Sequence, residues 1–384
     1  MVSAVRRGAS IRSVAKRFAV SPATVLTWSQ RAEGRRLDRV DFTDRPSRPQ
    51  RTHRTPDAVE DIVLEIRQDL KHNSDLGEYG ATAIHQELVA RGMKSPPSAR
   101  TIGRILERRG ALDGKRRTRR PPPPRGWYLP DLAAYEVELD EFDIIEDLRI
   151  QDGPLVDVLS GISLHGGLPS VWPVQAQIKA HRVLEALVER WRAVGLPAYA
   201  QFDNDTRFQG AHVHPDTIGR VMRLCLSLGV VAVFAPPRET GFQATIEKFN
   251  GRWHKSVWTR FHHDSLEELQ ERSVRYLQAF QQRHAARIGA APGRKPFPKR
   301  WRVDWEAQPK GIVVYLRRTD EDGRVALLGH TFTVDRLWPH RLVRCQVDLT
   351  ESNIRFFALR RREPAWQPIL KEIAHTIPQR TSHK

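Results

Sequence analysis

The chain of 384 residues has only two cysteines, Cys225 and Cys345, which lie far apart in the sequence. They cannot form the disulfide framework of a small secreted domain or, by themselves, a cysteine-based zinc site. The sequence also lacks an apolar run of about 18 residues and a signal-peptide pattern. We therefore expect a soluble, cytoplasmic protein in a reducing environment, with no membrane partner.

Acidic residues are too few to balance the basic ones. The chain has 63 Lys and Arg against 45 Asp and Glu, a formal net charge of +18. A surface of this charge attracts polyanions, of which nucleic acid is the commonest. Residues 1–55 hold 13 basic and 4 acidic residues, whereas residues 131–260 hold 13 basic and 17 acidic ones. This distribution suits a cation-gathering centre between flanks that bind phosphates.

Residues 1–34 are predicted to form a helix-turn-helix DNA-binding unit. Apolar residues recur at helical spacing from Ile11 to Phe18, and Ser21-Pro22 supplies an N-cap and a first-turn proline for a second helix. Short polar and Arg side chains are expected on the outer face of that helix, where they could read base edges. These candidate DNA-binding residues are Thr24, Thr27, Gln30 and Arg31. A plain helical hairpin is the alternative.

Two basic linkers are predicted, one before and one after a second helical unit. Residues 35–55 are predicted to be a basic linker, and residues 56–113 a second helical DNA-binding unit, although a basic structural bundle would give the same pattern. Residues 114–130 are predicted to be a stiff, basic, proline-rich linker. Its arginines are candidate DNA-binding residues: Arg116, Arg117, Arg119 and Arg120.

The pattern changes to alternating strands and helices over residues 131–262. Strands are expected at 135–140, 154–164, 168–174, 199–202 and 230–234, and helices at 180–194, 215–228 and from about 243. This order predicts an α/β domain with a mixed sheet. A helix and connector follow over 263–305, and residues 306–384 are expected to form a small C-terminal β domain and tail. The predicted fold is therefore multidomain, with all-α units, an α/β core and a β domain.

Three acidic residues occupy positions suited to metal-dependent phosphodiester chemistry. Such chemistry uses two divalent cations about 3.5–4 Å apart, held by converging carboxylates. Asp140 and Asp203 end two of the expected strands, and Glu247 lies on the helix that follows Pro236-Pro237. Because strand ends and a helix start can meet at one edge of a sheet, these acids are the candidate metal ligands.

Three stretches resemble motifs of the DDE-type transposases and retroviral-type integrases, in particular bacterial insertion-sequence transposases. They are YEVELD ending at Asp140, QFDN containing Asp203, and Pro236-Pro237 followed after nine residues by Glu247-Lys-Phe-Asn250. The resemblance covers nearly the whole chain, and the third block is its most specific part. It implies a ribonuclease-H-like catalytic core with a triad of Asp140, Asp203 and Glu247.

The same resemblance implies a function. A polynucleotidyl transferase of this kind would hold two Mg²⁺ or Mn²⁺ ions in each active site, cleave double-stranded DNA at element ends and join it to target DNA. It would act as a homo-multimer on DNA in a bacterial cytoplasm, associated with the nucleoid. A catalytically inactive DNA-binding regulator and a nuclease of the same fold that does not join strands are the alternatives.

The sequence departs from the family pattern in several places. Forty-three residues separate Asp203 from Glu247, more than is common in the integrases, and Glu239 matches the shorter spacing but precedes the helix. Asp205 stands where the family often has glycine, so it could perturb the loop or assist the metal. Asp143 and Asp157 compete with Asp140 for the first position.

Basic residues follow Glu247 on the same helix, and two histidines lie in the loop before residue 215. Lys248, Arg252 and Lys255 are expected to steer phosphates, although a solvated basic helix would look the same. His212 and His214 alone make a weak zinc site, and we interpret them as loop residues.

Overall fold

The computed structural model describes residues 1–43, 54–75, 78–112, 125–150, 153–210, 215–361 and 363–378. The chain divides into two compact units, Met1–Glu60 and Asp61–Lys384. No helix among the described residues is long and apolar enough to cross a membrane. The predicted arginine contacts at residues 116–120, the pair His212 and His214, and residues 44–53 of the linker predicted at 35–55 lie outside the described residues.

The first unit is helical, as the sequence predicted. It contains α1 (Val2–Arg6), α2 (Ile11–Arg17), α3 (Pro22–Arg31) and a 3-10 turn at Leu37–Arg39. The Ser21 hydroxyl accepts a hydrogen bond from the backbone N–H of Thr24, and Pro22 occupies the first helical turn, so α3 begins where its cap requires. Val14, Ala15 and Val25 form a small core between α2 and α3.

Three further helices follow: α4 (Asp57–Asn73), α5 (Ala81–Ala90) and α6 (Ala99–Arg108). Apolar residues spaced three and four apart on each helix meet in one core. Its fully buried members are Val63, Ile66, Ile84, Leu88, Ile102, Ile105 and Leu106. This region is helical, as the sequence predicted.

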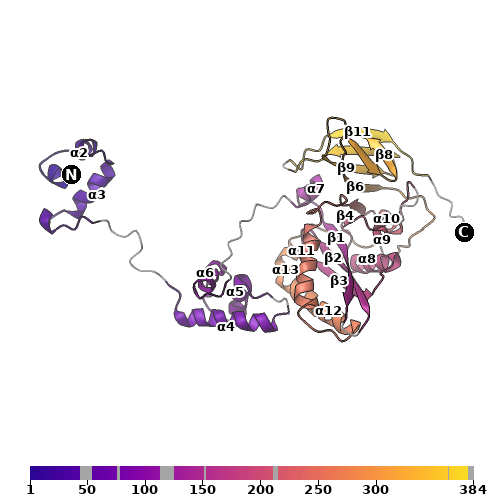
Figure 1. Ribbon diagram of the computed structural model, residues 1–384, viewed down its shortest axis with the longest axis horizontal. Coiled ribbons are helices and arrows are strands. Elements are labelled where there is room, and N and C mark those ends of the chain that lie inside the picture. The colour runs from indigo at the N-terminus through magenta and orange to yellow at the C-terminus, as the bar shows by residue number, and fades with distance from the viewer. Residues whose placement is uncertain are drawn as a thin grey trace. The chain divides into compact units, whose positions relative to one another are not determined.

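A mixed sheet forms the centre of the second unit (Figure 1). Strands β1 (Leu139–Arg149), β2 (Leu155–Ser163) and β3 (Pro169–Gln175) pair antiparallel, and β4 (Tyr199–Phe202) and β5 (Val231–Phe234) continue it in parallel beside β1. The order across this part is β5-β4-β1-β2-β3. Strand β1 begins later than the expected 135–140 and is longer. Glu138 lies before its start, and its buried carboxylate accepts hydrogen bonds from the backbone N–H groups of His165 and Gly166.

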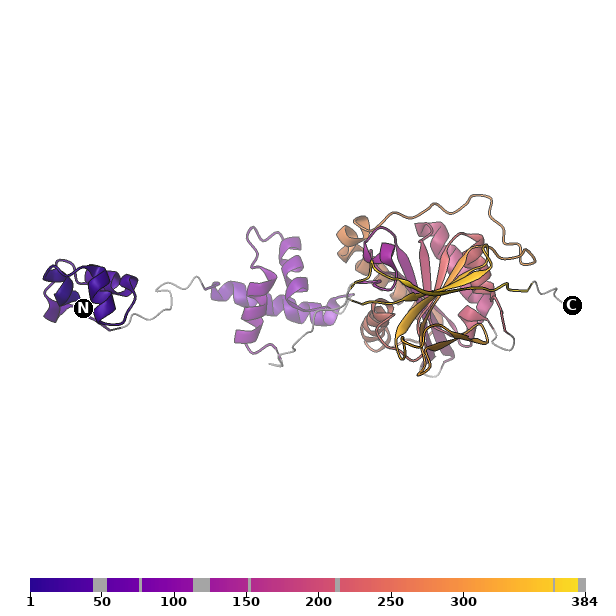
Figure 2. The same ribbon diagram turned by 90° about the horizontal axis from the view of Figure 1, so that it is seen from above.

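Helices cover both faces of this sheet, as Figures 1 and 2 show. On one face lie α8 (Ala180–Val194), the short α9 (Thr206–Gln209) and α10 (Arg220–Ser227). On the other lie α11 (Ala244–Trp253), which continues into a π-helical turn (His254–Trp258), and α12 (Leu266–Arg283). The short helices α7 (Pro130–Ala133) and α13 (Ala285–Gly289) flank the core. The layered α/β architecture agrees with the expectation for residues 131–262.

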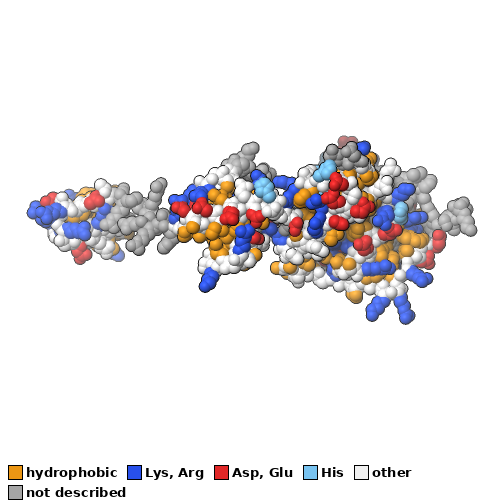
Figure 3. All heavy atoms as spheres, turned by 90° about the horizontal axis from the view of Figure 1, so that it is seen from below, with side chains coloured by type: hydrophobic (Ala, Val, Ile, Leu, Met, Phe, Trp, Pro, Cys, Tyr) orange, Lys and Arg blue, Asp and Glu red, His pale blue; other side chains and the backbone are white. Residues whose placement is uncertain are grey.

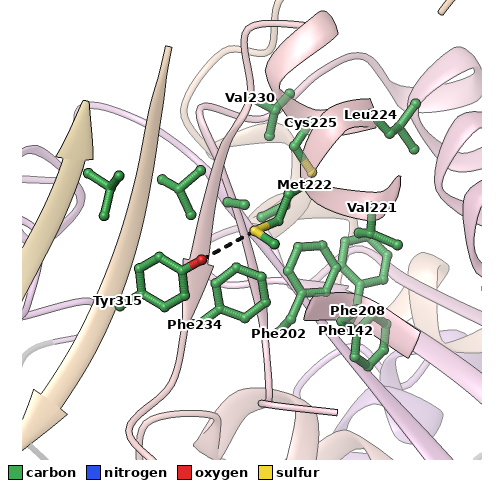
Figure 4. Packing of buried hydrophobic residues seen from close by; sticks show 14 of the residues in the cluster. Phe142, Phe202, Phe208, Val221, Met222, Leu224, Cys225, Val230, Phe234 and Tyr315 are labelled. Carbon is green, nitrogen blue, oxygen red and sulfur yellow. Dashed lines mark hydrogen bonds between the residues drawn. The ribbon is translucent and has the colours of Figure 1, made fainter. Parts of the chain in front are cut away.

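The larger core lies between the sheet and helices α8 and α10. Figure 4 shows aromatic side chains from successive strands stacked side by side: Phe142 and Phe202 are 5.6 Å apart between ring centroids, and Phe234 and Tyr315 are 5.1 Å apart. The Tyr315 hydroxyl donates to the Met222 sulfur at 3.3 Å. Burial of this much aromatic surface fixes the relative positions of β1, β4 and β5.

The C-terminal strands differ from the separate small β domain expected over 306–384. Strand β6 (Ile312–Arg318) pairs in parallel with β5, and β9 (Leu342–Asp348), β10 (Asn353–Ala358) and β11 (Ile369–Ala374) extend the same sheet to nine strands. Only β7 (Arg324–Leu327) and β8 (His330–Thr333) form a separate hairpin. The open edge of β5 explains the difference, because an unpaired edge of buried backbone donors and acceptors needs a partner strand.

Candidate active site

Asp140 lies on the face of β1 that is turned away from the other predicted acids. Its buried carboxylate accepts hydrogen bonds from Arg190 at 3.0 Å, from the Trp191 indole at 3.2 Å and from Arg294 at 3.2 Å. Burial alone would raise the pKa of Asp140, but the two guanidinium groups outweigh it and hold the pKa well below the ordinary value. The expected meeting of Asp140 with Asp203 and Glu247 is therefore corrected: the structure does not bring it to them.

Asp143, three residues further along β1, points to the opposite face. Side chains alternate along a strand, so residues at odd separation lie on opposite faces. Asp140 pairs with Ala200 and Glu141 with Gln201 in the parallel register of β1 and β4, and two more steps bring Asp143 level with Asp203. The competing candidate Asp143, rather than Asp140, is thus beside the carboxylate that follows β4.

The ionisation of Asp143 reflects this neighbourhood. Its pKa is raised to about 6, first by burial and then by the negative charges of Asp203 and Glu247. The pKa of Asp203 is also raised, chiefly by burial. Carboxylates raise one another's pKa when they converge without a compensating cation. Asp143 on β1 therefore lies within electrostatic reach of both Asp203, at the end of β4, and Glu247 on α11, and these three residues are called the Asp143 cluster.

Helix α11 supplies both Glu247, in its first turn, and an amide, Asn250, that contacts the cluster. Asn250 lies three residues after Glu247, on the same helix face, and its Nδ2 donates to Asp143 Oδ2 at 2.8 Å. The Asn250 Oδ1 atom is buried and has no hydrogen-bond partner among the described residues. A buried, unsatisfied acceptor next to three carboxylates is what a hard divalent cation, with its oxygen ligands and waters, would satisfy. The residues present fit such an ion.

Glu141 holds the start of α11 against the sheet. Its buried Oε2 accepts a hydrogen bond from the backbone N–H of Ile246 at 2.7 Å, and burial raises the pKa of Glu141 to about 8 despite that bond. Glu141 is not among the acids that the sequence pattern indicated. The signal was present, because the strand alternation that faces Asp143 toward Glu247 also faces Glu141 that way.

The remaining acidic candidates have structural partners. Asp205 caps α9 by accepting from the backbone N–H of Arg207, and its carboxylate pairs with the Arg207 guanidinium at 2.6 Å. Asp157 accepts backbone hydrogen bonds from Gln177 and Ile178 at 2.9 and 3.0 Å. Glu239 precedes α11 and is paired with Arg318. Among the described residues, Asp157 and Glu239 have no contact with the Asp143 cluster, whereas Asp205 lies next to Asp203: its backbone N–H donates to Asp203 Oδ1 at 3.0 Å and its negative charge raises the pKa of Asp203.

The predicted DNA-binding side chains are differently placed. On α3, Thr27 and Gln30 are exposed and Thr24 is partly so, whereas the Arg31 guanidinium donates to the Thr43 carbonyl and lies over the Trp28 ring at 5.0 Å. Beyond Glu247, Lys248 and Lys255 are exposed and Arg252 is half-buried. Arg31 therefore contacts residues of its own helical unit. The other predicted DNA-binding residues, on α3 and after Glu247, lie at or near the surface.

A groove lined by cationic and aromatic side chains lies beside the loop that precedes α11. It has a volume of about 670 Å³ and is lined by Trp127, Arg318, Trp338, Arg341 and Arg360, among others. The guanidinium of Arg341 lies 4.6 Å from the Trp338 ring centroid, and that of Arg360 lies 3.7 Å from the ring of Trp366. Such pairs suit nucleic-acid backbones and bases. Figure 3 shows basic and acidic side chains interspersed over one face of the protein rather than gathered into a single patch.

Comparisons with known proteins give only distant similarities. No protein-family model and no curated protein matches the chain. Among solved structures, a chain of the simian T-cell lymphotropic virus intasome in complex with PP2A regulatory subunit B56 gamma is 12% identical, with a TM-score of 0.34, covering 72% of this chain and 92% of that one. The HTLV-2 integrase catalytic core domain in complex with magnesium is 13% identical, with a TM-score of 0.29, covering 43% and 90%. The BIV integrase catalytic core domain is 15% identical, also with a TM-score of 0.29, covering 38% and 97%. Because these scores and identities are low, assignment of the site depends on its own geometry.

Proposed function

We propose that the chain is a metal-dependent polynucleotidyl transferase of the DDE type, with Asp143, Asp203 and Glu247 as its catalytic carboxylates. The observation that carries the proposal is their convergence from β1, the end of β4 and α11, together with the raised pKa of Asp143. The sheet order β5-β4-β1-β2-β3, with helices on both faces, supports a ribonuclease-H-like core. Asp143 takes the role that the sequence resemblance assigned to Asp140.

The three carboxylates would hold a pair of Mg²⁺ or Mn²⁺ ions, which would lower the pKa of an attacking water or 3′-hydroxyl and stabilise the leaving oxygen. The chain's own residues orient the ligands. Asn250 fixes the direction of the Asp143 carboxylate through its amide hydrogen bond, and Glu141 holds the backbone of α11 so that Glu247 faces β1. Arg190 and Arg294 neutralise Asp140 on the other face and keep it out of the cluster.

The proposed substrate is double-stranded DNA, both the ends of a mobile element and a target. The surface side chains Thr27, Gln30, Lys248 and Lys255 and the cationic groove beside Trp338 are proposed contacts to that DNA. A homo-multimer on DNA, in a bacterial cytoplasm, is the proposed working form, because two element ends must be held together.

The test is cleavage and joining of a labelled duplex that carries the element's ends, with Mg²⁺ or Mn²⁺. Wild type is expected to cut and join, while Asp143→Asn and Glu247→Gln lose activity more than about 100-fold, beyond what loss of an outer-shell group costs. Glu239→Gln is the matched control and is expected to retain activity. Specific end binding without cleavage by wild type would instead favour a DNA-binding regulator, and cleavage without joining would favour a nuclease.

A further inference from the structure

A second cluster of metal-binding side chains lies away from the Asp143 cluster, where three separate segments meet. Asp216 is in the loop before α10, His330 begins β8, and His375 directly follows β11. His330 Nε2 lies 3.0 Å from Asp216 Oδ2, and His375 Nε2 lies 2.8 Å from Asp216 Oδ1. One ligand atom from each of the three residues lies within 4.8 Å of the other two.

The backbone places each of these residues independently of the cluster. The N–H of Asp216 donates to the Leu328 carbonyl at 3.0 Å, with Asp216 at a φ of 57°, and the N–H of His375 donates to the Ser352 carbonyl at 2.9 Å. The side chains of Asp216 and His375 are only 11% and 15% exposed, while that of His330 is 39% exposed. The three donors are therefore held close together before any ion binds, with His330 toward solvent.

The distances suit a tetrahedral ion. Zinc binds imidazole nitrogen at about 2.0–2.1 Å and carboxylate oxygen at about 2.0–2.2 Å, which sets neighbouring ligand atoms roughly 3.3 Å apart. His330 Nε2 and His375 Nε2 lie 3.0 and 2.8 Å from different oxygens of the Asp216 carboxylate, and one ligand atom from each residue lies within 4.8 Å of the other two, so small side-chain shifts would bring three ligand atoms around one ion. Two imidazoles and one carboxylate leave a fourth position for water.

The surroundings favour a transition metal over magnesium. Imidazole nitrogens suit Zn²⁺ and its neighbours in the first transition row, whereas Mg²⁺ prefers oxygen. The Phe332 ring packs against both histidines, 5.9 Å from His330 and 5.6 Å from His375 between centroids, and gives the cluster an apolar side. Thiols do not compete here, because Cys225 and Cys345 are fully buried and burial raises the pKa of both.

We propose that Asp216, His330 and His375 bind a Zn²⁺ ion, with water in the fourth position, that fastens the loop before α10 to the β7–β8 hairpin and to the segment after β11. This site is independent of the proposed catalytic carboxylates and of the function proposed for them. In its metal-free form the same three side chains form a hydrogen-bonded cluster, in which the two imidazoles lower the pKa of Asp216 although burial would raise it.

The test is a titration of the full-length chain with Co²⁺ as a spectroscopic substitute for Zn²⁺, in excess Mg²⁺ and in an Asp203→Asn background. That background removes a ligand of the carboxylate cluster, so that failure of this proposal and failure of the proposed function are distinguishable. We expect one equivalent of Co²⁺ to give the visible absorption of a low-coordinate site with nitrogen ligands. Zn²⁺ should displace it.

Substitutions then locate the ion. His330→Gln and His375→Gln are each expected to weaken Co²⁺ binding at least tenfold. His262→Gln is the matched control, because His262 also pairs with an aspartate, Asp264, at 3.0 Å, but on an exposed surface with side-chain exposures of 58% and 83%. Zn²⁺ should raise the melting temperature of the control and leave that of the two histidine variants unchanged.

Two outcomes would overturn the proposal. One is the absence of stoichiometric Co²⁺ binding to the Asp203→Asn chain, which decides the matter even where the histidine variants do not fold. The other is binding of equal strength by the His330 and His375 variants, which would put the ion elsewhere.

Discussion

At the scale of single residues, Asp140 and Asp143 lie three residues apart on one strand but have different surroundings. Asp140 is fully buried against Arg190, Arg294 and Trp191, and its charge is neutralised. Asp143 has no guanidinium partner among the described residues: it accepts from the backbone N–H of Ile144 and from the Asn250 amide, and its pKa is raised by two further carboxylates. A buried carboxylate paired with guanidinium groups is costly to remove, whereas carboxylates close to one another without such partners attract cations.

The first prediction concerns the buried ion pairs. Asp140→Asn is expected to destabilise the protein by about 3–5 kcal/mol, because it leaves Arg190 and Arg294 buried without a counter-charge. Urea unfolding followed by tryptophan fluorescence measures the loss. Activity per folded molecule should remain near that of wild type. A variant as stable as wild type but inactive would restore Asp140 as a catalytic residue.

The second prediction is a pH dependence of the metal-free protein. The folded pKa of Asp143, about 6, exceeds the ordinary value of 3.8, so the folded state holds this proton more tightly than the unfolded state. The contribution is fully present below the unfolded pKa and is lost as the pH rises through the folded pKa. Wild type should therefore lose about 1–3 kcal/mol relative to Asp143→Asn between about pH 4 and about pH 7.

Denaturant unfolding in a chelator, at intervals across that range, measures the difference between the two proteins. Taking the difference cancels Glu141, whose raised pKa acts in the same direction in both. Saturating Mn²⁺ should reduce the slope in wild type only. A difference that does not change with pH would mean that Asp143 does not share its environment with Asp203 and Glu247.

At the scale of elements, the position of α11 relative to β1 decides whether Glu247 belongs to the cluster. The helix carries its apolar face, including Ile246, Phe249 and Trp253, into the core beneath β1 and β2. Apolar packing alone would allow α11 to rotate or slide slightly against the sheet. The hydrogen bond from Ile246 N–H to Glu141 removes that freedom at the end of the helix that bears Glu247.

The third prediction concerns this anchor. Glu141→Ala is expected to cost about 1–3 kcal/mol, because it leaves buried backbone N–H groups of α11 without an acceptor. It should also weaken Mn²⁺ binding, since Glu247 loses its fixed position. Glu141→Gln keeps an acceptor oxygen and should stay close to wild type. Electron paramagnetic resonance titration of Mn²⁺ and urea unfolding report the two effects separately. Equal losses in both variants would show that charge, and not the hydrogen bond, matters.

At the scale of the whole molecule, the C-terminal strands complete the sheet that carries the cluster. Val343, Cys345, Val347, Ile354 and Phe356, on β9 and β10, belong to the same core as Phe202 and Phe234. The first unit, by contrast, has its own small cores.

The fourth prediction compares two truncations. A chain ending at residue 310 is expected to aggregate or remain unfolded, because it exposes the edge of β5 and strips one side of the main core. A chain beginning at residue 54 should fold with the melting temperature of the full-length protein but bind DNA more weakly. Circular dichroism melting and gel-shift assays measure both. A folded, monomeric 1–310 fragment would contradict the continuous core.

The sequence by itself determined which segments of this protein form helices and which form strands, for most of its elements. The cap at Ser21, helical spacing of apolar residues and strand alternation are local signals, so the helical regions and the α/β order followed from them. Asp203 and Glu247 became candidates because of their positions at a strand end and on a helix, although the spacing between them is longer than is common in the integrases.

Only the tertiary structure decided which acid on β1 faces the cluster, where β1 begins and that β6 joins β5. Each depends on strand register, and a shift of one residue moves every side chain to the other face of the sheet. Asp140 and Asp143 are the same residue type on the same strand. They differ in the face of the sheet to which they point, Asp140 toward α8 and Asp143 toward α11. The Asp216–His330–His375 cluster joins residues up to 159 positions apart, a proximity that only the packed sheet creates.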